Sequence, residues 1–120
     1  MHYSTSTFRD LALLRLGHKE FIVAACDAVG GLGSKPDDVE QMEPECVGYF
    51  STRVVLLELL SVRAQPVMAM CTFCVELEPT ARQLMDGVKQ QLKEEQLDGN
   101  VTIEAYSKFS LKKYSPTAAR

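Results

Sequence analysis

The chain has 120 residues, of which 46% are hydrophobic and 24% are charged, and its net charge is −3. These values are typical of one globular domain with a modest core. The acidic balance argues against nucleic acid or an anionic membrane surface as a partner, because such proteins gather basic side chains. No apolar run approaches the roughly 20 residues of a membrane-spanning helix. Four cysteines without a visible secretion signal favour reduced thiols and a cytoplasmic location.

The first part of the chain predicts a flexible end followed by two strands. Residues 1–8 are polar, and we expect them to be flexible. The apolar runs 10–16 and 19–26 predict two strands. Gly17 and His18 separate these runs and predict a tight hairpin turn of the II′ type.

A long loop and a helix are expected next. Residues 27–44 are rich in glycine and acids and contain Pro36 and Pro44, which is typical of an irregular segment. Residues 45–63 then carry apolar side chains around much of a helix. A helix with so broad an apolar surface is expected to be buried on more than one side.

The second half predicts a strand, a helix and a last strand. Residues 66–77 are apolar enough for a long strand. Glu78-Pro79 marks a helix start, because a proline in the first turn lacks only an N–H that is free there anyway. Asp98-Gly99 marks its end, and residues 101–106 predict the final strand. The order β-β-α-β-α-β predicts a small α+β domain, with a polar tail at 109–120.

The loop after the second strand carries the candidate site. Asp27 follows that strand directly, and three glycines and a lysine come after it: Gly30, Gly31, Gly33 and Lys35. Glycines let backbone amides approach an anion closely, and a carboxylate at a strand end can hold a divalent cation. The combination suits a magnesium-bound polyphosphate, although neither the P-loop nor the dinucleotide pattern matches. A flexible surface loop is the alternative interpretation.

Cys71 and Cys74 have the spacing of a redox or zinc motif. On a strand, however, residues three apart point to opposite faces, so the two sulfurs could not share a metal or form a disulfide. We therefore interpret them as small buried hydrophobic residues.

Glu58 is a single charge inside the apolar helix. Burial of an unpaired carboxylate is costly. Glu58 is therefore expected to face solvent, to pair with Arg53 or Arg63, or to serve a site.

Three segments carry a resemblance to a known family: Cys26–Lys35, Arg63–Pro66 and Val75–Thr80. From Arg9 to Val88 the chain resembles the N-terminal domain of the AIR-synthase-like superfamily. Its members include aminoimidazole ribonucleotide synthase, thiamine-monophosphate kinase, selenophosphate synthetase and hydrogenase maturation factors. Within it, the chain looks most similar to the branch of the α-ribazole kinases.

The resemblance implies a single domain over residues 9–108, with a mixed four-stranded sheet and two helices on one face. It implies a homodimer whose sheets form a shared barrel, with ATP bound near the interface. It also implies roles for residues of the loop and the first helix: Asp27 would hold Mg²⁺ and ATP phosphates, Gly30, Gly31, Gly33 and Lys35 would contact the phosphates, and Glu58 would be a second acidic ligand.

The implied activity is ATP-dependent phosphorylation of a small alcohol or phosphate ester. Family members complete this site with a C-terminal domain. The chain is therefore expected to be a fragment of such a protein or to work with a separately encoded C-terminal domain. The chain also departs from the family pattern, with Cys71 where an Asp is usual and Leu57-Glu58 in place of Asn-Asp. A non-catalytic homodimerisation or ligand-sensing module is therefore the alternative, and whether the chain is an enzyme stays open at this point.

Overall fold

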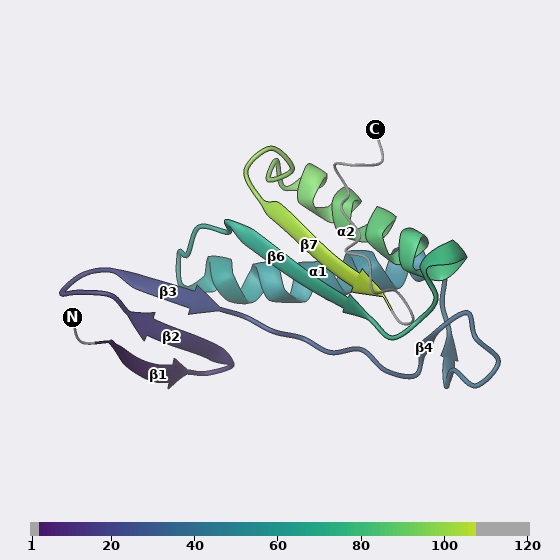
Figure 1. The fold of residues 1–120 in the computed structure, drawn as a ribbon, viewed down its shortest axis with the longest axis horizontal. Coiled ribbons are helices and arrows are strands. Elements are labelled where there is room, and N and C mark those ends of the chain that lie inside the picture. Colours follow the sequence, from purple (N-terminus) through teal and green to yellow (C-terminus); the bar gives the residue numbers. More distant parts are fainter. Residues whose placement is uncertain (1–2, 108–120) are drawn as a thin grey trace.

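The structure is a computed structural model that describes residues 3–107 and shows an α+β fold (Figure 1). No helix within this range is both long and apolar enough to cross a lipid bilayer. In chain order, the elements are β1 (Ser4–Phe8), β2 (Leu11–Arg15), β3 (Phe21–Ala24), β4 (Leu32–Gly33), β5 (Glu40–Gln41), α1 (Pro44–Ser61), β6 (Met68–Phe73), the π-helical turn η1 (Leu77–Ala81), α2 (Arg82–Glu94) and β7 (Thr102–Ser107).

The first three strands form an antiparallel meander with β2 in the middle. β1 lies within the segment that we expected to be flexible, and its threonines have the branched side chains that suit a strand. The tight II′ turn is wrong, because residues 16–20 connect β2 to β3 and Gly17 lacks the positive φ that such a turn needs. The Arg15 side chain holds this wider turn by donating to the carbonyl oxygens of Gly17 and His18, at 2.6 and 3.2 Å.

The two long helices pack against each other through glycines. A Cβ on Gly48 would overlap the carbonyl oxygen of Leu84, and a Cβ on Gly87 would overlap that of Glu45. Only glycine permits such a close approach of two helix backbones. This contact fixes α2 against the N-terminal half of α1.

α1 does not have the burial that its sequence predicts. Its buried positions follow one stripe that includes Val47, Gly48, Thr52 and Leu56. Apolar side chains on other faces are exposed instead: Phe50, Val54, Leu57 and Leu60. Within the described chain, α1 is therefore covered on one side.

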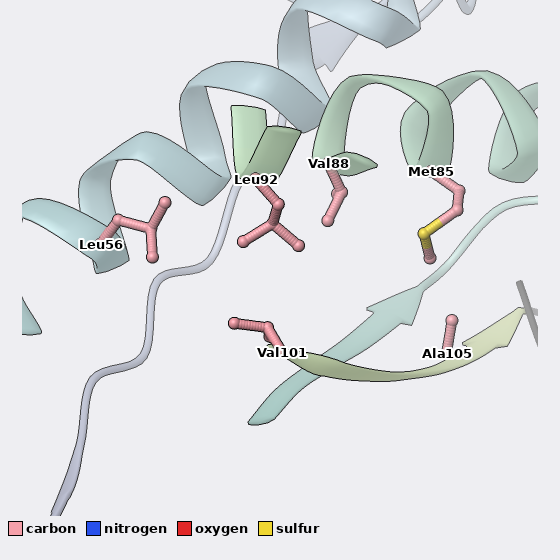
Figure 2. Packing of buried hydrophobic residues seen from close by; sticks show 6 residues of the cluster. All are labelled: Leu56, Met85, Val88, Leu92, Val101 and Ala105. Carbon is pink, nitrogen blue, oxygen red and sulfur yellow. The ribbon is translucent and has the colours of Figure 1, made fainter. Parts of the chain in front are cut away.

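β6 and β7 form a parallel pair that lies over the helices, and the main core lies between the two layers (Figure 2). The buried side chains of this core come from both helices and from β7 and the residue before it: Leu56, Met85, Val88, Leu92, Val101 and Ala105. Alternate side chains of β6, including Ala69 and Cys71, pack on it from the sheet. The other face of the pair carries exposed Met68, Met70 and Tyr106.

The strands of residues 3–107 do not join into one mixed four-stranded sheet, which differs from the expectation. They form three separate sheets, namely β1-β2-β3, β4-β5 and β6-β7. β1 supplies the third strand of the meander, and no ladder links the free edge of β3 to β6. Figure 1 shows the meander extending to one side of the body that α1, α2, β6 and β7 form.

The ends of α2 also differ from the prediction. Glu78 has extended backbone angles inside η1, so the regular helix begins at Arg82 rather than at Glu78-Pro79. The helix ends at Glu94, and Gln96 adopts the left-handed conformation (φ 59°) expected of Gly99. The Leu97 amide closes this end by donating to the carbonyl oxygen of Leu92 at 2.8 Å. The polar tail at 109–120 lies outside the described residues.

Candidate functional site

The glycine-rich loop is ordered by backbone hydrogen bonds between β4 and β5. The Glu40 amide donates to the carbonyl oxygen of Gly31 at 3.0 Å, and the Met42 amide donates to that of Gly33 at 2.9 Å. Gly31 has a φ of 74°, which favours glycine. The segment that we expected to be irregular therefore contains a small parallel ladder.

An acidic side chain of the loop already accepts a hydrogen bond from one of the loop's backbone amides. The Lys35 amide donates to Asp38 Oδ2 at 2.9 Å, and the Asp38 amide returns a bond to the Lys35 carbonyl oxygen at 3.1 Å. A Cβ on Gly33 would lie 2.6 Å from the same Asp38 oxygen, so this carboxylate needs a glycine beside it. The loop can therefore hold an anionic oxygen, and here the chain supplies that oxygen itself.

The Lys35 side chain connects the loop to the start of the second helix. Its Nζ lies 2.7 Å from Glu76 Oε1, and the same oxygen accepts a hydrogen bond from Thr80 Oγ1 at 2.5 Å. The hydrogen bond from Lys35, followed by that from Thr80, lowers the pKa of the Glu76 carboxyl from its ordinary 4.5 to about 2. Glu76 is therefore charged at neutral pH and neutralises the cation of the loop.

Asp27 and Gly30 lie in the extended segment between β3 and β4, and both are exposed. A Cβ on Gly30 would meet nothing within 4 Å, so this glycine is not required by packing. Gly31, Gly33 and Lys35 lie instead in the ordered part of the loop, where each takes part in a backbone hydrogen bond.

Glu58 is separated from the loop by the length of α1. The helix has 18 residues and is thus about 27 Å long, with the loop leading into its first turn and Glu58 near its last turn. Glu58 is half-buried, and its Oε2 is a buried atom without a hydrogen-bond partner in the described part of the chain. No ion pair joins it to Arg53 or Arg63 there, so pairing, one of the three alternatives for Glu58, is not formed.

The cysteines and the other metal-ligating side chains form no cluster within residues 3–107. No three side chains of His, Cys, Asp or Glu lie close enough together within this range to hold a metal ion. Cys71 is half-buried, and burial raises the pKa of its thiol, whereas Cys74 is exposed and lies beyond the end of β6. The prediction of a buried residue is therefore wrong for Cys74.

The face of the meander carries a shallow open hollow of about 450 Å³. Small polar and apolar side chains line it, among them Thr5, Thr7, Leu14 and Ile22. None of the side chains that line it is ionisable, and the strands contribute mostly small or apolar side chains to it.

Asp38, Glu76 and Thr80 are not among the site residues that the sequence predicts. The Lys-Pro-Asp-Asp sequence at 35–38 is a turn signal that could have pointed to Asp38, since an aspartate often bonds to a backbone amide of its own turn. Glu76 is 41 positions from Lys35, and no local pattern predicts that contact. Comparisons with family models, with curated proteins and with solved structures find no match to this chain.

Proposed function

We propose that this chain is a nucleotide-binding domain similar to the N-terminal domain of AIR-synthase-like enzymes, in which the loop around Lys35 binds the phosphates of ATP. In this proposal it acts as a homodimer, and a C-terminal domain of the kind that family members carry completes the site. The reaction is the transfer of a phosphoryl group from ATP to a small alcohol or phosphate ester, as in α-ribazole kinases.

The observation that carries the proposal is the bonding of the loop to its own carboxylates. The Lys35 amide binds Asp38, and the Lys35 ammonium binds Glu76. Both groups are donors that suit a phosphate oxygen equally well. Phosphoryl transfer depends mainly on such positioned donors and cations.

A magnesium ion fits only as a partner of bound phosphates. Mg²⁺ commonly uses one or two carboxylates, with phosphate oxygens and water completing its shell. Asp27 is an exposed carboxylate at the entry to the loop and would be this ligand. Glu58, near the far end of α1, supports the proposal less well as a second ligand.

The open apolar faces support a homodimer. Met70 is 73% exposed on the outer face of the parallel pair, and Ile22 is 54% exposed on the meander. A sheet face with large apolar side chains is normally covered by a second layer of structure. A second copy of the chain would supply that layer.

The second candidate is a non-catalytic homodimerisation or ligand-sensing module. The missing cluster of metal ligands within residues 3–107 and the half-buried Cys71 favour it. In this case the open sheet faces would still bind another copy, while the loop would have only a structural role.

Calorimetric titration with ATP separates the two candidates. The nucleotide-binding proposal predicts micromolar binding that requires Mg²⁺ and is weakened by Asp27→Ala, while Asp37→Ala serves as a matched loop control. Unchanged Mg²⁺-dependent affinity in Asp27→Ala would remove Asp27 from the site. Sedimentation of the unliganded chain tests the dimer separately, and a monomer at all accessible concentrations would contradict it.

A further inference from the structure

We propose that Glu76 is an internal competitor for Lys35 that latches the glycine-rich loop shut until an anionic ligand displaces it. The latch consists of three side chains, Lys35, Glu76 and Thr80. Its competition with a ligand rests on the proposed function, whereas its closure of the loop does not.

The geometry of the latch is that of a bound anion. One oxygen of Glu76 accepts from the Lys35 ammonium and from the Thr80 hydroxyl at 2.7 and 2.5 Å. A phosphate oxygen would accept from the same two donors. The Lys35 ammonium cannot bind the Glu76 carboxylate and a phosphate oxygen at the same time without weakening both contacts. A ligand phosphate must therefore compete with Glu76 for Lys35.

The latch also joins two parts of the chain that are far apart in sequence. Lys35 belongs to the β4–β5 loop, whereas Glu76 directly precedes η1 and Thr80 lies within it. Thr80 is buried, so this end of the latch is fixed to the helical body. Lys35 and Glu76 are partly exposed, with side chains 45% and 36% accessible, so the contact can open without unfolding the core.

An exposed ion pair is weak enough to be displaced. Pairs of this kind change an equilibrium by up to about fivefold. A ligand whose interaction with Lys35 outweighs this fivefold effect would displace Glu76. The loop would then be free to adjust around the phosphates. The latch thus moderates affinity without preventing binding.

Glu76→Ala tests the latch, and Glu78→Ala is the matched control. Both variants remove one glutamate from the same short segment, but Glu78 pairs with Arg82 rather than with Lys35. The latch predicts that Glu76→Ala speeds hydrogen exchange of the loop amides of Lys35, Asp38, Glu40 and Met42 by up to about fivefold. The core amides of Val88 and Leu92 should keep their wild-type rates in both variants.

Titration with MgATP supplies the second readout. The latch predicts up to about fivefold tighter binding to Glu76→Ala and unchanged binding to Glu78→Ala. Hydrogen-exchange rates of the loop amides that are identical in wild type and Glu76→Ala overturn the latch. MgATP binding by Glu76→Ala that is equal to or weaker than that of wild type also overturns it. If no form of the protein binds MgATP, the proposed function fails, and the exchange comparison alone then decides whether Glu76 closes the loop.

Discussion

The glycine contact between the helices makes Gly87→Ala the most informative change to the fold. The new Cβ would overlap the carbonyl oxygen of Glu45 and lie 2.7 Å from the backbone nitrogen of Tyr49. Both atoms belong to the backbone of α1, so neither can turn away as a side chain could. The two helices would have to separate, which would loosen the packing around Met85 and Val88.

Two opposing terms set the size of this effect. Overpacking of this kind costs about 1–3 kcal/mol or more, whereas alanine is favoured over glycine inside a helix by about 1 kcal/mol. We therefore expect a net loss of about 2 kcal/mol, because the overlap involves backbone atoms that cannot relax. At about 4 °C per kcal/mol, the melting temperature should fall by about 8 °C.

Thermal unfolding followed by circular dichroism measures this shift. Gly99→Ala is the control, since a Cβ there meets nothing within 4 Å, and its stability should change by less than about 0.5 kcal/mol. A Gly87→Ala protein as stable as the wild type would refute the close packing of the helices.

Three further predictions concern a buried amide, the loop and the acid response. Gln91 is 1% exposed and its Oε1 has no hydrogen-bond partner within residues 3–107. Gln91→Leu should therefore raise the free energy of unfolding, measured by urea titration, by about 1 kcal/mol, and a decrease would contradict this prediction. Gly33→Ala should push the Asp38 carboxylate off the Lys35 amide and speed the exchange of that amide, while Gly30→Ala, whose Cβ meets nothing, should leave it unchanged. Because the pKa of Glu76 falls from 4.5 to about 2 on folding, its stabilising effect is complete above pH 4.5 and is lost as the pH falls toward 2. The stability difference between wild type and Glu76→Ala, measured by urea unfolding, should therefore shrink over that range, and a difference that grows there would show the opposite sign.

Local patterns predicted the helices and most strands of this chain. α1 and α2 follow from long apolar periodicities, and β2, β3, β6 and β7 follow from short apolar runs. β1 was missed because its residues are polar and become a strand only by pairing with β2. The end of α2 was misplaced because Gln96 takes the conformation that the sequence suggests for Gly99.

Long-range contacts account for the rest of the differences. Gly48 and Gly87 are far apart in sequence, so nothing local indicates that they bring two backbones together. The same holds for Lys35 and Glu76, whose contact decides the charge of the candidate site. The loop itself was predicted from its glycines and its lysine, but its bonding to Asp38 depends on the turn geometry at 35–38.

The most direct test of the loop as a nucleotide site is an amide NMR titration of the chain with MgATP. We expect saturable shifts at the amides of residues 30–35 and of Glu76, with a micromolar midpoint that requires Mg²⁺. An absence of shifts at millimolar MgATP, or shifts confined to the hollow of the meander around Leu14 and Ile22, would contradict the assignment of the loop as the nucleotide site.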